Sequence, residues 1–170
     1  MDGPSGQGLW ALVLAAGEGR ADLAQALAVV ESARVDGIVR GAVAVIPAGR
    51  TDLLDEVIRA GMLPLLDPGE KPGVASALRL GLEFLSDPNL EPAAAAAVIL
   101  PADGWATAVS LAHLAARWRE GGATAFRPAG LPAPLLLDRA AWPLLQRLQG
   151  ARAVRALRDV KGFPAVPVPV

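Results

Sequence analysis

The sequence predicts a three-layer α/β protein whose sheet is mostly parallel, as in a Rossmann-like fold. Its short apolar runs suit strands that are buried on both faces, and each run ends near a turn that contains Gly, Pro or Asp. Amphipathic stretches of helical length separate the runs, as in successive βαβ units with helices on both faces of the sheet. The apolar runs are Leu9–Leu14, Ala42–Ile46, Met62–Leu66 and Ala94–Leu100.

Four helices are expected in this part of the chain, over residues 21–35, from 51 or 52 onwards, over 74–85 and over 107–119. In each of them apolar side chains recur at spacings of three and four residues, which gathers them on one face. The side chains expected on these buried faces are Leu23, Leu27, Val30, Leu53, Leu54, Val57, Ile58, Ala75, Leu78, Leu82, Leu85, Leu111, Leu114, Ala115 and Trp118.

The last part of the chain is expected to form shorter elements. Two short strands, Ala123–Phe126 and Pro134–Leu137, precede two helices near residues 139–148 and 151–160. The chain then ends in the extended segment Phe163–Val170, which contains three prolines. Because proline lacks the backbone N–H that a central strand donates, we expect this segment at a sheet edge or as a tail.

The composition limits the classes of function. The 170 residues contain no repeat and no linker, so one domain is expected over residues 1–170. The absence of Cys excludes disulfides and thiolate chemistry, and a single histidine, His113, excludes a metal site with two imidazoles. The first residues lack the basic start of a signal peptide, and no apolar run is long enough to span a membrane. We therefore expect a cytoplasmic protein that does not engage a membrane.

Charge is distributed unevenly, although the net charge is only −1. Residues 1–116 contain seven Lys or Arg against fourteen Asp or Glu, whereas residues 117–170 contain nine against three. The two regions can neutralise each other in the fold, or the basic region can attract a phosphorylated partner. Aromatic residues make up only 4% of the chain and Tyr is absent, so nucleic acid is not an expected partner.

The stretch with the most chemical content is Leu14–Arg20, where the first apolar run ends in a glycine-containing turn before a helix. Backbone N–H groups and the helix dipole make such a turn an anion site, and glycine lets a phosphate approach closely. A plain strand-to-helix turn also needs small residues, so a purely structural role stays open. Asp103 follows the fourth apolar run, and the carboxyl ends of parallel strands form one ligand-binding rim. The turn and Asp103 are therefore expected to share a site.

Four stretches in order span nearly the whole chain: Leu14–Arg20, Gly73–Gly81, Ile99–Gly104, and a fourth that combines Gly130–Pro132 and Leu148–Gly150 with Arg155. This ordered set resembles the nucleotidyltransferases that make molybdenum-cofactor dinucleotides. These are the MobA-like and molybdopterin cytidylyltransferase-type proteins, which have the glycosyltransferase-A-like fold of the nucleotide-diphospho-sugar transferases. The resemblance implies the same three-layer α/β fold for this chain.

The resemblance also implies an activity. A family member joins a nucleoside triphosphate to a phosphorylated acceptor such as molybdopterin and releases pyrophosphate, and positioning and charge neutralisation do most of the work in such chemistry. Arg20 and Asp103 would be the catalytic residues, with Asp103 on the carboxylate that binds Mg²⁺. The nucleotide would be held by Ala15, Ala16, Gly17, Gly19, Arg20, Gly73 and Ser76, and the acceptor by Gly130, Pro132 and Arg155.

Two departures from the family pattern affect the triphosphate. The family loop continues past its arginine to a lysine, whereas here Arg20 runs into Ala21-Asp22-Leu23, and no acid follows Asp159 where the family has a second metal-binding aspartate. Both departures reduce the neutralisation of the negative charge on the bound triphosphate. An active nucleotidyltransferase and a degenerate member that serves as a binding or partner protein are therefore both kept as hypotheses. A sugar-phosphate nucleotidyltransferase is a weaker third, because such enzymes are usually longer.

Individual site residues also have simpler interpretations. Asp103 can cap the helix that begins near Thr107, and serine is common in a first helical turn, where Ser76 lies. Arg155 belongs to a series of three arginines at a spacing of three residues, a pattern typical of a solvated helix face.

Overall fold

The computed structural model describes residues 8–16, 19–71, 73–104 and 106–170. Seven strands form one sheet: β1 (Gly8–Leu14), β2 (Gly41–Pro47), β3 (Leu63–Asp67), β4 (Ala94–Pro101), β5 (Ala125–Pro128), β6 (Leu135–Asp138) and β7 (Val166–Val168). The helices are α1 (Arg20–Val35), α2 (Thr51–Arg59), α3 (Val74–Leu85), α4 (Ala108–Glu120), α5 (Trp142–Gln146) and α6 (Ala151–Arg158), with the 3₁₀ turn η1 (Arg139–Ala141).

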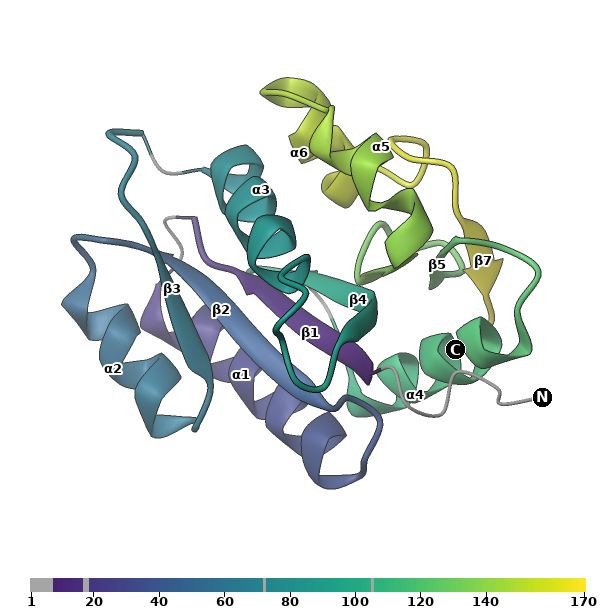
Figure 1. Cartoon of the computed structure of the whole chain (residues 1–170), viewed down its shortest axis with the longest axis horizontal. Helices are drawn as coiled ribbons and strands as arrows, with labels where there is room; N and C mark the ends of the chain where they lie inside the picture. The colour runs from purple at the N-terminus through teal and green to yellow at the C-terminus, as the bar shows by residue number, and fades with distance from the viewer. Residues whose placement is uncertain (1–7, 17–18, 72, 105) are drawn as a thin grey trace.

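The helices cover both faces of the sheet, which confirms the predicted three-layer α/β class. In the view of Figure 1, α1, α2 and α4 lie below the sheet and α3, α5 and α6 lie above it. Strand β1 is buried along its whole length and supplies both cores. Its Ala11 and Val13 pack toward α1 and α4, whereas Leu12 and Leu14 pack toward α3. An apolar strand without polar alternation therefore marks the centre of the sheet.

The strand order is β3-β2-β1-β4-β6-β5-β7, so the sheet is mostly parallel as predicted. Strands β3, β2, β1 and β4 are mutually parallel, and Leu12 of β1 is level with Val43 on one side and Ile99 on the other. Strand β6 runs antiparallel to both β4 and β5. Strand β7 pairs with β5 at the edge of the sheet, where the prolines of the final segment predicted it.

The structure corrects the sequence analysis at a few elements. The face predicted for α2 is too wide, because Ile58 is 58% exposed while Leu53 and Val57 are buried. This helix lies beside the edge strand β3, so there is less sheet for it to cover (Figure 1). The helix predicted near residues 139–148 is instead η1 followed by the short α5. Within the described residues no helix has the combination of length and apolar character that crossing a membrane requires.

Candidate active site at the carboxyl ends of the strands

The carboxyl ends of the parallel strands β1 and β4 lie next to each other, as predicted from the sequence. The backbone N–H of Ala102 donates to the carbonyl of Leu14 at 2.8 Å, which ties the loop after β4 to the end of β1. The N–H of Ala15 donates to the carbonyl of Val45 at 2.9 Å, so this amide continues the hydrogen bonding between β1 and β2. Ala16 is half-buried. Gly17, the centre of the predicted phosphate turn, lies outside the described residues.

The turn ends at Gly19, which is the N-cap of α1. Gly19 is extended, supplies no side-chain cap to the helix, and has open space where a Cβ would stand. Gly19 therefore gives the amides of the first turn of α1 no capping side chain, an arrangement that leaves these amides to an anion. Asp22, in the same turn, is an acidic group beside this position.

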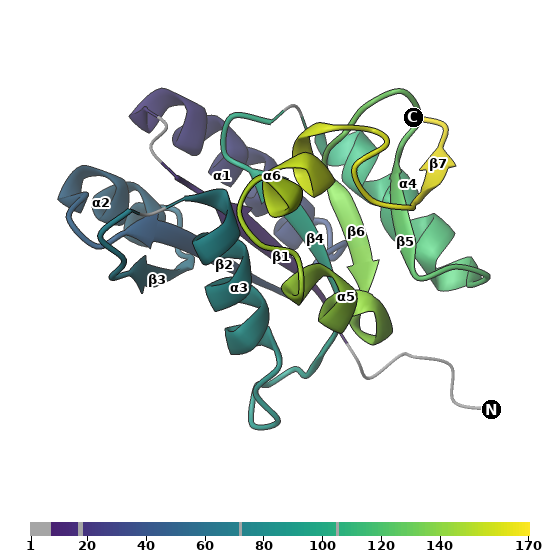
Figure 2. The same cartoon turned by 90° about the horizontal axis from the view of Figure 1, so that it is seen from above.

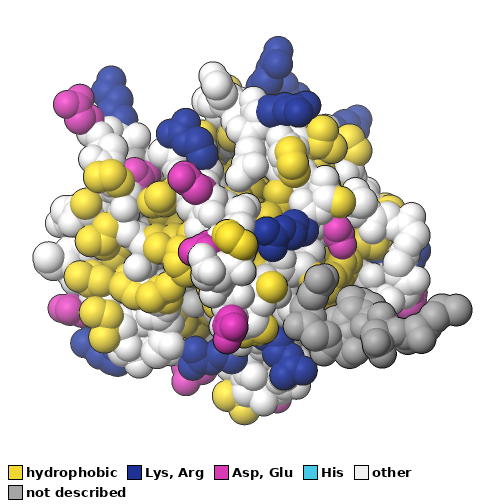
Figure 3. Space-filling model, viewed as in Figure 1, with side chains coloured by type: hydrophobic (Ala, Val, Ile, Leu, Met, Phe, Trp, Pro, Cys, Tyr) yellow, Lys and Arg dark blue, Asp and Glu magenta, His cyan; other side chains and the backbone are white. Residues whose placement is uncertain are grey.

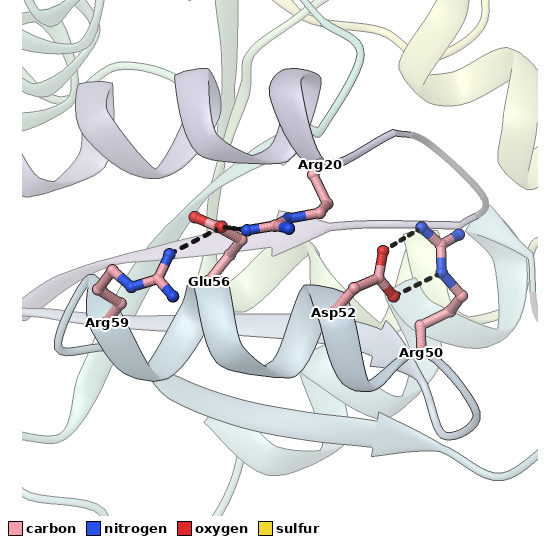
Figure 4. Close-up of polar contacts among 5 residues, drawn as sticks. All are labelled: Arg20, Arg50, Asp52, Glu56 and Arg59. Carbon is pink, nitrogen blue, oxygen red and sulfur yellow. Dashed lines mark hydrogen bonds and ion pairs between the residues drawn. The ribbon is translucent and has the colours of Figure 1, made fainter.

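Arg20 begins α1, but its guanidinium is engaged with α2. Figure 4 shows the side chain reaching Glu56, which also accepts a hydrogen bond from Arg59 at 2.9 Å. The hydrogen bond from Arg20 lowers the pKa of Glu56, and the same bond raises the pKa of Arg20. Arg20 would have to leave Glu56 to neutralise a triphosphate. Its side chain is 56% exposed, so such a movement meets no packing barrier.

Asp103 stands directly after β4 and does not cap α4. That cap is Thr107, whose Oγ1 accepts from the N–H of Ser110 at 3.1 Å while Ser110 Oγ accepts from the N–H of Thr107 at 3.0 Å. The Asp103 carboxylate instead accepts a hydrogen bond from Nη1 of Arg158, the last residue of α6, at 2.6 Å. The capping interpretation of Asp103 is therefore wrong, and its side chain is paired with Arg158 at the rim.

Two pockets meet at Asp103. The first, of about 200 Å³, lies between β4 and α1 and includes Asp22 and Gln25 with Asp103. The second, of about 240 Å³, lies on the other side and is lined largely by apolar side chains, with Arg158 and Asp103 as its charged groups. The remaining lining of this second pocket is Pro101, Gly104, Leu131, Pro132, Ala133 and Leu157. Asp103 therefore separates a carboxylate-lined space from an apolar space that holds one arginine.

Two of the residues predicted to hold the nucleotide, Gly73 and Ser76, lie together at the start of α3. Gly73 is the N-cap, and its N–H donates to Ser76 Oγ at 3.1 Å. The Ser76 hydroxyl donates its single proton to the buried carboxylate of Asp67 at the end of β3, at 2.5 Å. Asp67 also accepts from the N–H of Gly69 at 3.0 Å. Ser76 thus fixes the loop between β3 and α3, and toward a ligand its oxygen could act only as an acceptor.

A third pocket, of about 440 Å³, opens beside this helix start. It has two cationic side chains from the α3 side and two glutamines from the α5–α6 segment. Figure 2 shows α6 beside α3 across the middle of the sheet, which explains how segments distant in sequence line one pocket. Its side chains with polar groups are Lys71, Ser76, Arg79, Gln146 and Gln149. Among these five, only Ser76 was given a site role from the sequence, although Arg79 and Gln149 lie in the stretches that carry the resemblance.

The residues predicted for the acceptor divide into two groups. Pro132 lines the pocket beyond Asp103, and Gly130 makes the neighbouring turn with a positive φ of 77°. Arg155 does not line any of these three pockets; its side chain is 70% exposed and lies 3.8 Å from Asp159. Arg158 instead lines the apolar pocket beyond Asp103. The spacing of three residues between these arginines was visible in the sequence, but the pairing with Asp103 that distinguishes Arg158 was not.

Arg127 of β5 explains how α6 is held at the rim. Only 2% of this residue is exposed, and its guanidinium donates to the carbonyls of Asp159 at 2.8 Å, Ala156 at 3.2 Å and Phe163 at 3.1 Å. Burial lowers the pKa of Arg127, and no acidic side chain forms an ion pair with it within the described residues. A cation at the carbonyl end of a helix interacts favourably with its dipole. Arg127 therefore fixes the end of α6 that presents Arg158 to Asp103.

The donor set at the rim fits a divalent cation that is shared with a nucleotide. Across the described ranges, no three His, Cys, Asp or Glu side chains come together as a complete protein cage for a metal. Asp103 and Asp22 nevertheless line one pocket, and Mg²⁺ is commonly held by one or two carboxylates together with phosphate oxygens and water. Mn²⁺ accepts the same oxygen ligands.

The fold and the rim define an α/β protein with a ligand site beyond the carboxyl ends of its parallel strands. Comparison with models of protein families and with curated protein sequences gives no match. Solved structures do match. Rv0371c from Mycobacterium tuberculosis H37Rv, in a complex with manganese, has a TM-score of 0.70 and 19% identity over 96% of this chain and 88% of that chain.

A second Rv0371c structure gives a TM-score of 0.67 and 17% identity over 96% of this chain and 88% of that chain. A nucleotidyl transferase from Methanothermobacter, Mth528, gives a TM-score of 0.60 and 12% identity over 89% of this chain and 83% of that chain. Identities this low establish the fold alone. The chain therefore has a nucleotidyltransferase-like fold.

Proposed function

We propose that this protein binds a nucleoside triphosphate together with a divalent cation and transfers its nucleotidyl group to a phosphorylated acceptor. The observation that supports this function best is the meeting of three predicted parts at one rim. The uncapped start of α1, the carboxylate of Asp103 and the α3 start with Ser76 all lie at the carboxyl ends of parallel strands. Ligands of open α/β sheets bind at such a rim.

The proposed cation site is Asp103, with Asp22 in the same pocket. A cation bound there, Mg²⁺ in the first instance, would supply charge neutralisation to the phosphates. The Rv0371c structure in complex with manganese is consistent with this proposal because its fold is shared, although the binding is a property of that protein. The triphosphate would lie toward the start of α1, and the base toward the pocket beside α3.

The proposed acceptor is a phosphorylated small molecule in the apolar pocket beyond Asp103. Pro132 lines this pocket, and Arg158 supplies a cation for a phosphate group. The MobA-like resemblance favours molybdopterin as the acceptor and molybdenum-cofactor biosynthesis as the process. Because nucleoside triphosphates are abundant in the cytoplasm, the proposal also implies a cytoplasmic protein.

A second candidate function is a degenerate nucleotidyltransferase-fold protein that binds ligands or a partner without catalysis. One specific observation favours it. Both charged side chains predicted for the triphosphate are engaged within the protein, Arg20 with Glu56 and Asp103 with Arg158. An enzyme would have to break both ion pairs during its cycle, whereas a binding protein could retain them.

Calorimetric titration of CTP and GTP, with and without Mg²⁺ or Mn²⁺, tests the proposed function. We expect metal-dependent binding of one nucleotide, weakened at least about tenfold by Asp103→Asn because its cation ligand is lost. The matched control is Asp52→Asn, which removes another half-exposed carboxylate that is paired with an arginine, at a distance of 2.9 Å from Arg50. Failure of both nucleotides to bind would refute the proposal. Pyrophosphate release with an acceptor present separates the enzyme from the degenerate binding protein.

A further inference from the structure

The ion pair between Asp103 and Arg158 joins the two sides of the candidate site. Arg158 ends α6 and Asp103 follows β4, 55 positions earlier in the chain. Their 2.6 Å separation is that of a charge-assisted hydrogen bond. Both side chains are partly exposed, 42% for Arg158 and 34% for Asp103, so solvent and ligands can reach the pair.

The position of Arg158 is fixed by the packing of α6. The buried Arg127 binds the carbonyls of Ala156 and Asp159, which flank Arg158 in the chain. Gly162 packs so tightly against this helix that a Cβ there would come within 1.8 Å of the carbonyl oxygen of Arg155. The backbone is thus held from two sides. The Asp103 contact differs in this respect from the flexible ion pairs of a typical protein surface.

The other arginines of α6 do not share this contact. Arg155 faces Asp159 at a longer distance of 3.8 Å, and Arg152 is exposed. Figure 3 shows several Lys and Arg side chains over the upper part of the molecule, where α6 lies, and others at the centre and the lower edge of this face. The helix therefore contributes a general positive potential, to which Arg158 adds one specific contact with a carboxylate.

A divalent cation and a guanidinium compete for the single negative charge of Asp103, whose Oδ2 accepts from Arg158. We infer that Arg158 is an exchangeable counter-ion of Asp103: it holds the carboxylate in the absence of metal and is displaced when a divalent cation binds there. This inference rests on the proposed function for the identity of Asp103 as the cation ligand. The displaced guanidinium remains in the pocket with Leu131 and Pro132, because its backbone is anchored, and it faces the phosphate of the acceptor.

The exchange couples two ligands at the site. Without the cation, the Arg158 charge is neutralised by Asp103 and attracts an anion weakly. With the cation bound, Arg158 offers its donors to a phosphate, so cation binding strengthens anion binding at the same pocket. By linkage, an anionic acceptor strengthens cation binding by the same factor. The neighbouring opposite charges of Asp103 and Arg158 then link the binding of the cation to the binding of the anion.

Titration of Mn²⁺ alone, followed by the electron paramagnetic resonance signal of the free ion, tests the exchange without nucleotide. Arg158→Gln should bind Mn²⁺ about fivefold more tightly than the unsubstituted protein, because the competing cation is gone. Arg155→Gln makes the same change of net charge on the same helix and should alter the affinity less than about twofold. Asp103→Asn should abolish the binding, alone and combined with Arg158→Gln.

Equal effects of Arg158→Gln and Arg155→Gln would overturn the inference, since the change would then be general electrostatics. Weaker Mn²⁺ binding in Arg158→Gln, or no binding in any variant, would overturn it as well. Circular dichroism and urea unfolding of each variant establish that the fold is intact. Because no nucleotide is present, failure of CTP and GTP to bind in the separate calorimetric experiment concerns the proposed function and leaves this result independent.

Discussion

The two regions that build the candidate site are stabilised in different ways. Residues 8–120, with β1–β4 and α1–α4, form the parallel part of the sheet around the fully buried strands β1 and β4. Residues 125–168, with β5–β7 and α5–α6, also have a buried apolar core, and three side chains there add hydrogen bonds to backbone carbonyls. These are Arg127 to three carbonyls, Arg139 to those of Ala94 and Ser86, and Trp142 to that of Leu137.

This difference has a consequence for the site. Apolar burial is non-directional and distributes stability over many side chains, so the first region tolerates the loss of any one contact better. Hydrogen bonds to buried carbonyls are directional, and an unsatisfied partner is costly. The region with the proposed nucleotide site therefore depends mainly on apolar packing, whereas the position of α6 beside the proposed acceptor pocket depends in addition on a few residues such as Arg127.

Arg127→Met gives the largest expected effect and tests this dependence directly. Methionine keeps much of the buried apolar volume but leaves the carbonyls of Ala156, Asp159 and Phe163 without their donor, so the free energy of unfolding should fall by about 3 kcal/mol. Urea unfolding measures this change. The control is Arg147→Met, an exposed arginine of the same region, expected within about 0.5 kcal/mol of the unsubstituted protein. A loss below about 1 kcal/mol for Arg127→Met would mean that apolar packing also dominates the second region.

Replacing one close-packed glycine in each region by alanine compares how rigidly the two regions are packed. In Gly162→Ala the new Cβ would lie 1.8 Å from the backbone oxygen of Arg155, whereas in Gly81→Ala it would lie 2.4 Å from Cδ1 of Leu12. A backbone atom can give way only if α6 moves, while the tip of a leucine can change its rotamer. We expect losses of about 3 kcal/mol for Gly162→Ala and about 1.5 kcal/mol for Gly81→Ala in thermal or urea unfolding. Equal losses would contradict the contrast between a rigidly anchored and an adaptable region.

The same contrast explains which features the sequence could predict. The continuous apolar run of residues 9–14 and the helical spacing of Leu111, Leu114 and Trp118 both reflect burial. The structure has these side chains buried as expected. The position of Asp103 at the site was predicted because the carboxyl ends of parallel strands lie at the same edge of a sheet. The partners of Arg20, Arg127 and Arg158 were not predictable, since they depend on contacts between residues that are 29 to 55 positions apart. Charged side chains show no periodic pattern that would reveal such contacts.

The smallest expected effect concerns the exposed ion pairs of the first region. Hydrogen bonding to Arg20 lowers the pKa of Glu56 below its ordinary 4.5, and hydrogen bonding to Arg50 lowers the pKa of Asp52 to about 2 (Figure 4). A lowered folded-state pKa adds stability that is complete above the unfolded-state value and is lost as the pH falls through the folded-state value. Glu56→Gln should therefore lower the melting temperature by about 1–2 °C at pH 7.

This difference should begin to shrink as the pH falls below 4.5, where the unfolded chain takes up a proton at Glu56, and it should vanish below the lowered folded-state pKa, where Glu56 is uncharged in both states. Salt at about 0.5 M should reduce it at pH 7, since exposed charges are screened. A difference that persists unchanged at pH 3 would show that Glu56 acts through packing. Thermal unfolding at pH 7, 5 and 3 distinguishes these outcomes. The expected result leaves Arg20 only weakly held by α2, and a weak hold is what the proposed nucleotide site requires if this guanidinium is to turn toward a triphosphate.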